Sequence, residues 1–584
     1  MASSTGGGGG VAREAWGSRV GLVLAMAGQA VGLGNFLRFG RQVVLNGGGS
    51  FMVAYVAALL LLGLPMALVE WALGRFGGLH GKGHPAGMFA CAWRHPASKY
   101  LGALSMGITL AVLSYYSCVE SWAFAFMWLS LARDYEGLAS HGEMARYVHE
   151  FHAVGWRPAV ALALTLLINV LVIRRGIAGG IELLAKVAMP LMLGFAGVLL
   201  LVVLVALPPQ AGVGASVWDG LVFMYRPEAA RLLDASVWVA AAGQVFFTLS
   251  VGMGTLSAYA SYVRRRDDIV AASLTAAGLN EAVEVALGGS LTIPAAVVFF
   301  GVAGALAIAA GGSFDLGFAV MPLVFMRLPL GFVLGAMWFA LLFVAGITSS
   351  VAMATPIIAF LVEEFGMERE RAALALSAVV VPLAFMHMLM LPHGFMDEFD
   401  YWAGTLGLVL YGLLEIVVFV WLHGPSNAWS SLHLGAHVRL PSLPVKYIIV
   451  YVAPLYLLVL LLWWCVQDAW PILTLQRSAG GGVPTADNLP YILASRAVLL
   501  AIFVAVLALV AWAWRRNAYD DRAGFPELDR ELDQDDDVAA AADDETMPLC
   551  SSTAATRGTR ANWKRLSSST TELLSLTTPA RDRE

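Results

Sequence analysis

The feature that most constrains this chain is an interruption in its first long apolar segment. Val31-Gly32-Leu33-Gly34-Asn35 places two glycines and an asparagine inside a run long enough to span a bilayer. Backbone groups without helical partners are costly in hydrocarbon, so such a break persists only where it lines a cavity. A second apolar segment is interrupted in the same way at Val251-Gly252-Met253-Gly254. Paired broken helices are typical of proteins that carry a solute across the membrane, which is the function we predict.

Composition indicates a membrane protein independently of these breaks. The chain has 584 residues, of which 59% are hydrophobic and only 13% are charged, whereas about 25% are charged in a soluble domain. Apolar runs near the ~20 residues that cross a bilayer number about twelve. The predicted fold class is therefore an all-α membrane protein with twelve transmembrane helices. The predicted spans are 19–42, 49–75, 100–132, 158–174, 182–207, 236–263, 269–300, 331–362, 371–391, 399–422, 446–468 and 491–514.

Basic residues flanking the spans predict the orientation. Eighteen Lys and Arg residues fall on the side of the N-terminus and eight on the other side. Because basic residues concentrate in cytoplasmic loops, both termini are expected in the cytoplasm of a multi-pass protein of the cell (plasma or inner) membrane.

Three regions differ in composition. Residues 1–12 are Ser/Gly-rich and predict a flexible N-terminus, without the basic region and cleavage site of a secretory signal. Residues 13–516 form the predicted transporter domain. Residues 517–584 are acidic and then Ser/Thr-rich, which predicts a disordered cytoplasmic tail.

Local motifs along most of the chain carry a family resemblance. They include Trp16-Gly17-Ser18-Arg19, Gly34-Asn35-Phe36-Leu37-Arg38-Phe39, Asn46-Gly47-Gly48-Gly49, Glu70-Trp71-Ala72-Leu73-Gly74-Arg75, Gly243-Gln244-Val245-Phe246-Phe247-Thr248-Leu249-Ser250, Leu279-Asn280-Glu281, Ala345-Gly346-Ile347-Thr348-Ser349-Ser350 and Tyr401-Trp402-Ala403-Gly404-Thr405. In this order they resemble the neurotransmitter:sodium symporter family, and its bacterial leucine-transporting members most. The resemblance implies a transporter, not an enzyme, with the leucine-transporter fold. In that fold spans 1 and 6 are broken, spans 1–5 and 6–10 form a 5+5 inverted repeat, and spans 11 and 12 are peripheral.

The first break has the chemistry to bind an amino acid. Free N–H groups at a half-helix N-terminus suit a carboxylate, and Leu33 and Gly34 are placed to offer them. The family's monoamine carriers have an aspartate at the position of Gly32, so glycine here favours a substrate with its own carboxylate. The alternative is that these glycines only allow close helix packing.

By resemblance, twelve residues form the substrate pocket, with Tyr116 donating to the carboxylate and Phe247 lying over the substrate. They are Ala30, Gly32, Leu33, Gly34, Val112, Tyr116, Phe247, Thr248, Ser250, Met253, Ser349 and Met353. Because thioether side chains are flexible, Met253 and Met353 predict an adaptable pocket for neutral, apolar amino acids. The alternative is that the aromatic and Met residues are ordinary core.

Two sodium sites follow from the same resemblance, since sodium is a hard cation that oxygen atoms bind. Sodium site 1 would comprise Ala30, Asn35, Thr248, Asn280 and the substrate carboxylate. Sodium site 2 would comprise the carbonyls of Gly28, Val31 and Ala345 with the hydroxyls of Thr348 and Ser349. A shared carboxylate would make each ligand improve the other's affinity. The alternative is that the hydroxyls bond back to their own helix.

Charged residues predict gates at both sides of the pocket, or else ordinary surface pairs. The external gate would be Arg38 with Asp400, and the cytoplasmic gate Arg13 with Glu363, supported by Tyr262 and Trp16. Glu284 lies inside a span, where relatives that need chloride have a small hydroxyl residue, so it predicts transport without chloride. A structural role for Glu284 in a satisfied polar network is the alternative.

The predicted function is import of neutral, apolar amino acids coupled to sodium by alternating access. The predicted partners are this substrate, sodium ions and the lipid bilayer, and not nucleic acid. The rival hypothesis is a nontransporting membrane receptor that senses an amino acid and signals through the tail.

Overall fold

The computed structural model describes residues 14–152, 155–210, 213–311, 314–479 and 483–519. The chain divides into a unit of residues 1–526 and a second of residues 527–584, and every described residue belongs to the first. These residues form helices, turns and loops, without a β-strand among them. The predicted flexible N-terminus and nearly all of the predicted tail lie outside the described residues.

Ten helices of the described part are long and apolar enough to cross a membrane. They are Gly49–Leu79, Ser98–Leu131, Trp156–Ile173, Ile177–Ala206, Ile269–Ala310, Gly331–Phe365, Arg369–His393, Phe395–Leu422, Ser442–Leu473 and Leu489–Arg516. The pair Arg19–Ala30 and Gly34–Leu45, bent by 45°, makes an eleventh if counted as one span. The predicted span 236–263 is divided into α12 (Ala235–Thr248) and α13 (Thr255–Ala260), each short of a full crossing. The count of twelve stays a prediction.

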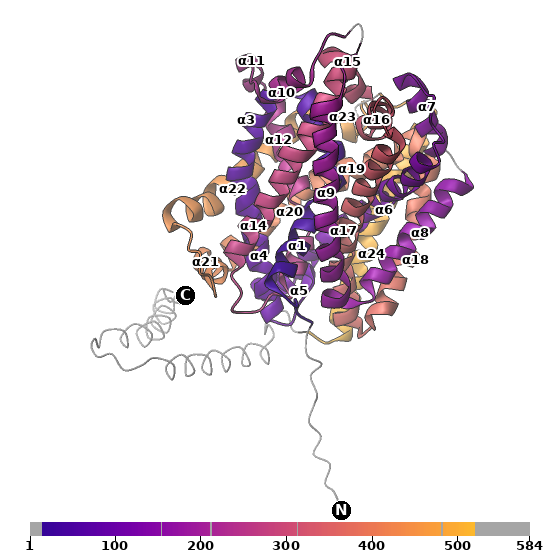
Figure 1. The fold of residues 1–584 in the computed structure, drawn as a ribbon. Coiled ribbons are helices and arrows are strands. Elements are labelled where there is room, and N and C mark those ends of the chain that lie inside the picture. The colour runs from indigo at the N-terminus through magenta and orange to yellow at the C-terminus, as the bar shows by residue number, and fades with distance from the viewer. Residues whose placement is uncertain (1–13, 153–154, 211–212, 312–313, 480–482, 520–584) are drawn as a thin grey trace, which may run out of the picture. The chain divides into compact units, whose positions relative to one another are not determined.

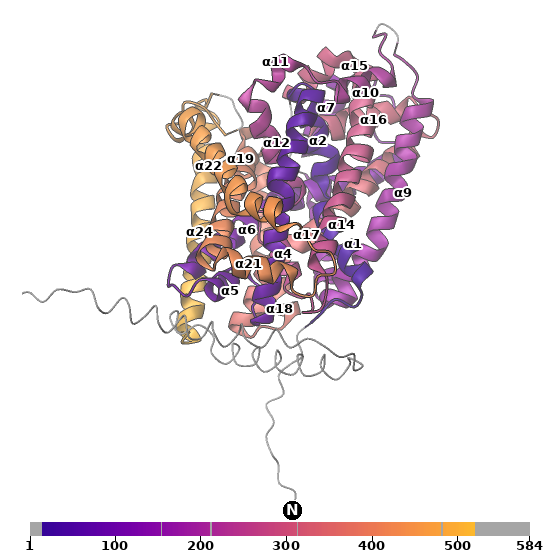
Figure 2. The same ribbon diagram turned by 90° about the vertical axis from the view of Figure 1, so that its left-hand side faces the viewer.

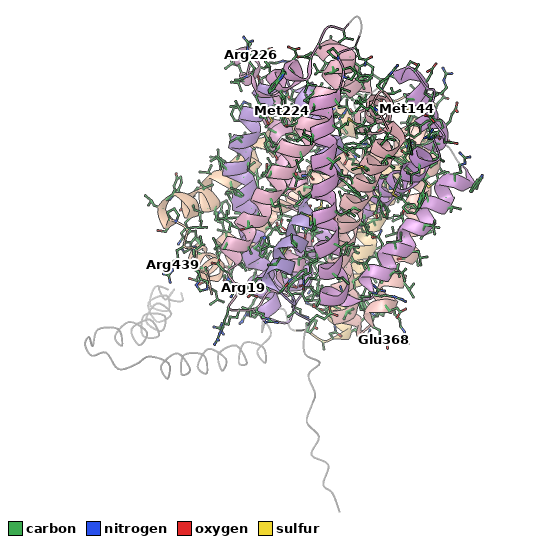
Figure 3. All side chains as sticks on the ribbon, viewed as in Figure 1. Arg19, Met144, Met224, Arg226, Glu368 and Arg439 are labelled. Atoms are coloured by element: carbon green, nitrogen blue, oxygen red, sulfur yellow. The ribbon has the colours of Figure 1, made fainter. Side chains whose placement is uncertain are left out.

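Shorter helices lie at the two ends of the bundle (Figures 1 and 2). At one end lie α7 (His141–His152), α10 (Val217–Tyr225) and α11 (Ala229–Leu232), and at the other lie α5 (Pro85–Ala92) and α21 (Pro425–His433). In Figure 3, Arg19, Glu368 and Arg439 lie at the end of α5, whereas Met144 and Arg226 lie opposite. This division agrees with the sequence-based orientation, and we call the two ends the predicted cytoplasmic end and the predicted external end.

The core is built around α6 (Ser98–Leu131) and α17 (Gly331–Phe365), which pack against each other along their lengths. The helix α6 is almost wholly buried, whereas α8 (Trp156–Ile173) exposes Leu164, Leu167 and Leu171. An outer helix with exposed leucines suits contact with lipid. The half-helix α1 (Arg19–Ala30) packs against α17 and α14 (Ile269–Glu281), so the break after Ala30 lies inside the protein.

Glycine permits the close approach of α4 (Leu64–Leu79) to the second broken span. A Cβ atom on Gly74 would lie 2.2 Å from the Ser257 carbonyl oxygen of α13. Neither backbone can give way without moving the helix beside the break.

We therefore predict that Gly74→Ala destabilises the protein by about 1–3 kcal/mol, the usual cost of overpacking. Thermal unfolding of purified protein in detergent, followed by size-exclusion chromatography, would show a lower midpoint. Gly194→Ala is the matched control, because nothing lies within 4 Å of a Cβ built on Gly194 in α9 (Leu183–Ala206). Equal midpoints for the two variants would contradict the prediction.

Candidate substrate and sodium site

The first break is held open by side chains from its own segment and from α6. The half-helix α1 ends at Ala30, and a π-helical turn begins at Gly34 and continues into α2 (Phe39–Leu45). Between them, the Leu33 amide donates to the Tyr116 hydroxyl at 3.0 Å and the Gly32 amide donates to Asn35 Oδ1 at 2.8 Å. A Cβ atom on Gly32 would lie 2.7 Å from Ser349 Oγ and 2.8 Å from the Tyr116 hydroxyl oxygen, so any other residue here would have to displace these side chains.

The second break depends on left-handed backbone and a buried carboxylate. Ser250, Gly252 and Gly254 have φ values of 53°, 77° and 71°, a region that glycine adopts readily. The Gly252 amide donates to Glu70 Oε1 at 2.5 Å, and Thr109 Oγ1 donates to the Met253 carbonyl at 2.7 Å. Side chains of α4 and α6 thus satisfy backbone groups that hydrocarbon would leave without partners.

The two breaks face one small cavity of about 10 Å³. Ten of the twelve predicted pocket residues line it, together with Asn35: Ala30, Gly32, Gly34, Tyr116, Phe247, Thr248, Ser250, Met253, Ser349 and Met353. Leu33 lines the larger cavity on the external side, and Val112 is fully buried outside the lining. The flexible side chains of Met253 and Met353 border this small space.

The side chains of predicted sodium site 1 converge. Asn35 Nδ2 donates to Asn280 Oδ1 at 2.9 Å and to Thr248 Oγ1 at 3.2 Å, and Asn280 Nδ2 donates to Thr248 Oγ1 at 3.0 Å. Three segments, the outer half of the first span, α12 and α14, meet here. All three side chains carry oxygen, so the donor set fits a hard cation. Ala30 and Thr248 line the small cavity, beside the place predicted for the substrate.

Predicted sodium site 2 lies between α1 and α17. Thr348 Oγ1 and Ser349 Oγ lie 3.0 and 3.2 Å from the Ala345 carbonyl oxygen, and Ser349 Oγ also donates to the Gln29 carbonyl at 3.0 Å. A Cβ atom on Gly28 would lie 3.6 Å from Thr348 Cβ, so the two helices are in contact here. Val31 is fully buried at the end of α1. The hydroxyls do bond back to their helix, as the alternative reading expected, and they also face α1.

A larger cavity of about 330 Å³ lies on the external side of the small one. Phe247 and Tyr116 line both cavities, and Arg38 and Asp400 line the larger one. The Arg38 guanidinium lies 4.4 Å from the Phe247 ring centroid, and Asp400 accepts a hydrogen bond of 2.8 Å from Tyr115. Among the described residues, Arg38 and Asp400 have no ion pair within 4.0 Å of each other, so the predicted external gate is open in this conformation.

The predicted cytoplasmic gate is packed shut as far as it is described. Trp16 Nε1 donates to the Tyr259 carbonyl at 3.2 Å, and Glu363 accepts the Gly83 amide at 2.8 and 2.9 Å. Tyr262, in the turn after α13, is buried. Arg13, the predicted partner of Glu363, lies outside the described residues.

Comparison with known proteins identifies the family. The pattern of the sodium:neurotransmitter symporter family matches residues 13–138 and 140–511. The chain belongs to this family. It is therefore a sodium-dependent, multi-pass membrane transporter and not an enzyme.

Individual relatives agree with this placement. The chain is 28% identical over 460 residues to an uncharacterized sodium-dependent transporter of Methanocaldococcus jannaschii, covering 76% of this chain and 89% of the relative. It is 24% identical to the sodium- and chloride-dependent GABA transporter 2 of Rattus norvegicus, covering 72% and 75%. The crystal structure of MhsT in complex with L-phenylalanine is similar with a TM-score of 0.67 and 26% identity, covering 77% of this chain and 99% of that one. These matches confirm the leucine-transporter fold.

The buried Glu284 lies in a polar network of the kind that the structural alternative expected. Tyr55 and Gln244 donate to its two oxygens, each at 2.5 Å. The sequence analysis missed Glu281, whose Oε2 lies 2.7 Å from the same Tyr55 hydroxyl oxygen, so the two acids share the one proton of that hydroxyl. Glu281 lies three positions before Glu284 on the same helix face, a spacing that could have indicated it.

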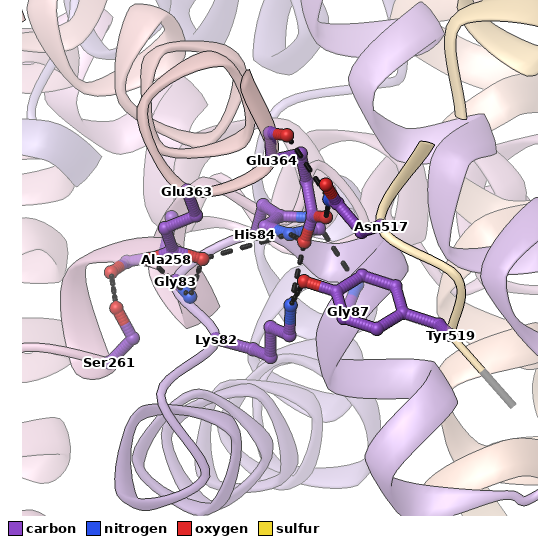
Figure 4. Close-up of polar contacts among 10 residues, drawn as sticks. All are labelled: Lys82, Gly83, His84, Gly87, Ala258, Ser261, Glu363, Glu364, Asn517 and Tyr519. Carbon is purple, nitrogen blue, oxygen red and sulfur yellow. Dashed lines mark hydrogen bonds and ion pairs between the residues drawn. The ribbon is translucent and has the colours of Figure 1, made fainter. Parts of the chain in front are cut away.

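A second cluster that the sequence analysis missed closes the predicted cytoplasmic end (Figure 4). Glu364, at the end of α17, accepts hydrogen bonds from Lys82 Nζ at 2.7 Å, His84 Nε2 at 2.9 Å and Asn517 Nδ2 at 2.8 Å. Lys82 Nζ also donates to the Tyr519 hydroxyl at 3.0 Å. The first residues of the predicted disordered tail, from Asn517 to Tyr519, are therefore held in place. We call these five residues the Glu364 cluster.

In the Glu364 cluster, the charge of Lys82 and the ring proton of His84 both suit hydrogen bonds to the Glu364 carboxylate. Burial lowers the pKa of Lys82, but the neighbouring Glu364 carboxylate raises it more, so the pKa of Lys82 lies above its usual value. His84 Nδ1 accepts the Gly87 amide at 3.2 Å, which leaves the ring proton on Nε2, facing Glu364. Lys82 is thus charged at neutral pH and needs its buried partner.

We predict that Glu364→Gln lowers the stability of the protein by about 3 kcal/mol, because it removes the buried negative charge that lies against the charged Lys82. The double variant Lys82→Met/Glu364→Gln should recover part of this loss, since it removes the buried positive charge as well. Arg371→Gln is the control, because Arg371 pairs with Glu368 at the surface, with both side chains more than 70% exposed. The thermal midpoint in detergent measures all three. A midpoint for Glu364→Gln equal to that of Arg371→Gln would contradict the prediction.

Proposed function

We propose that the protein is a symporter that imports neutral, apolar amino acids with sodium across the plasma membrane, with both termini in the cytoplasm. The observation that carries this proposal is the pair of breaks facing one cavity. Gly32 leaves that cavity without a fixed carboxylate of its own, and the Leu33 amide and Tyr116 hydroxyl lie at its edge. A ligand that brings a carboxylate matches these donors.

Substrate and sodium would be bound cooperatively. In the proposed arrangement, the substrate carboxylate completes sodium site 1 beside Asn35, Thr248 and Asn280, and sodium site 2 joins α1 to α17 through Thr348 and Ser349. Two ligands that share an oxygen raise each other's affinity by the same factor. The pocket would then close only when substrate and sodium are both bound, and not around either ligand alone.

The pocket walls support an apolar side chain on the substrate. Met253 and Met353 line the cavity without a charged residue among the lining side chains. A charged substrate side chain would lose its hydration on entering this cavity and would find no oppositely charged residue in the lining, which is costly. The complex of MhsT with L-phenylalanine supports an amino acid as the ligand class.

Alternating access is supported by the asymmetry of the two sides. The described path is packed at Trp16, Tyr259, Glu363 and the Glu364 cluster, whereas a cavity of about 330 Å³ lies on the external side. The proposed cycle closes the external cavity over the substrate and then separates the contacts at the cytoplasmic end.

Uptake by purified protein in vesicles tests the proposal. With an inward sodium gradient, we expect accumulation of L-leucine, L-methionine, L-alanine or L-phenylalanine, and no accumulation with potassium in place of sodium. Asn35→Ala should lower the uptake rate at least tenfold, because it removes an oxygen of sodium site 1. Sodium-dependent binding without uptake would favour the receptor hypothesis instead. Competition by charged amino acids stronger than by leucine would contradict the apolar pocket.

Transport without chloride is proposed from Glu284, a buried acid held by Tyr55 and Gln244 that would take the place of the anion when it is ionised. We predict that uptake by the wild-type protein is the same in chloride and in gluconate, and that Glu284→Ser makes it depend on chloride. Glu281→Gln is the matched control, since it neutralises the neighbouring acid and leaves Glu284 in place. A Glu284→Ser variant with the same rate in both anions would contradict the prediction.

A further inference from the structure

The external cavity contains four charged side chains on two helices. Arg38 and Arg41 lie three positions apart in the outer half of the first span, and Asp397 and Asp400 lie three positions apart in α19 (Phe395–Tyr401). All four line the cavity of about 330 Å³. Residues three apart share one face of a helix, so each helix presents two like charges to the cavity.

The direction of the chain places these charges at two levels. The first span runs from the predicted cytoplasmic end outward, so Arg41 lies one turn farther out than Arg38. The helix α19 begins the tenth predicted span at the external end and runs inward, so Asp397 lies one turn farther out than Asp400. Arg38 and Asp400 are thus the inner cation and anion of the cavity, and Arg41 and Asp397 are the outer ones.

Both levels are unpaired in this conformation. No nitrogen of Arg38 or Arg41 lies within 4.0 Å of a carboxylate oxygen of Asp397 or Asp400 in the described residues. Arg41 Nε donates to the Ala309 carbonyl at 2.8 Å, and the side chain of Asp397 makes no hydrogen bond to a described residue.

The cavity is large enough for water, which would hydrate charges that make no ion pair. An arginine within a span is costly unless it is hydrated or paired. As the cavity closes, water leaves and the effective dielectric constant falls, so the attraction between opposite charges grows. Arg41 and Asp397, the outer cation and anion, each make no ion pair with a described residue.

We propose that Arg41 and Asp397 are an outer pair of the external gate, which forms when the cavity closes over the bound amino acid. This rests on the proposed function, in which Arg38 and Asp400 form the inner pair. The two residues position the closed gate and do not contact the substrate. Their pairing slows release of substrate to the external side.

Charge-neutral variants test the pair through sodium-dependent binding of radiolabelled L-leucine to purified protein. Arg41→Gln and Asp397→Asn change the charge of the cavity in opposite directions. If the residues act as a pair, both variants weaken leucine binding about two- to fivefold, the double variant is no weaker than either, and Arg41→Asp/Asp397→Arg returns to within about twofold of wild type. Opposite shifts, or no shift, would overturn the proposal, because the charges would then act on the ligand separately or not at all.

Cross-linking tests the closure without relying on leucine binding. In a protein whose four cysteines are replaced by serine, Arg41→Cys and Asp397→Cys should be linked by a short bifunctional methanethiosulfonate, faster in sodium with leucine than in potassium. Each single-cysteine variant is the control. No link in any condition overturns the outer pair, even where uptake is normal. A link in a protein that accumulates no amino acid supports the outer pair and overturns the proposed transport.

Discussion

The structure depends on how backbone groups at two breaks find partners inside the membrane. An unpaired N–H or C=O in hydrocarbon costs several kcal/mol, and helical bonding is lost after Ala30 and again after Thr248. Side chains supply what the helices lack: Tyr116 meets the Leu33 amide, and Glu70 meets the Gly252 amide. The breaks are therefore stable only inside the shell formed by α4, α6 and α17. That shell has to form before any ligand site can.

The same requirement connects the two breaks to each other. Gln29, the residue next to last in α1, donates through Nε2 to Thr255 at the start of α13, at 2.9 Å. Its backbone carbonyl accepts from Ser250 and Ser349, at 3.4 and 3.0 Å. One residue thus ties the inner half of the first span to the second break and to α17. Movement of α1 would disturb all three segments together, as the alternating access that we propose requires.

Sequence reasoning located the local features and missed the long-range ones. The glycines at positions 32, 252 and 254 indicate the two helix breaks in the sequence, because the backbone conformation of a break depends on residues that are adjacent in the chain. Lys82 and Tyr519 are 437 positions apart, and no local pattern indicates that they meet at Glu364. Val112 was expected in the pocket lining and lies outside it, because its place depends on how α6 rotates against its neighbours. Asn517 and Tyr519 follow a helix end and look like the start of a polar tail until their partners are known.

Charged residues have different surroundings in the parts of the protein that stay fixed and in the part that would close. Glu284 and Glu364 are buried among donors that satisfy their oxygens, and removing one partner of such a group is costly. Arg41 and Asp397 instead border a cavity that can hold water, where separation costs little. A buried ion pair resists motion, because breaking it leaves a buried charge without its partner. A hydrated pair lets the walls of the external cavity move, and it joins them only when water is expelled. Charges of the second kind therefore belong at the external gate, where the closed form must be both reached and left.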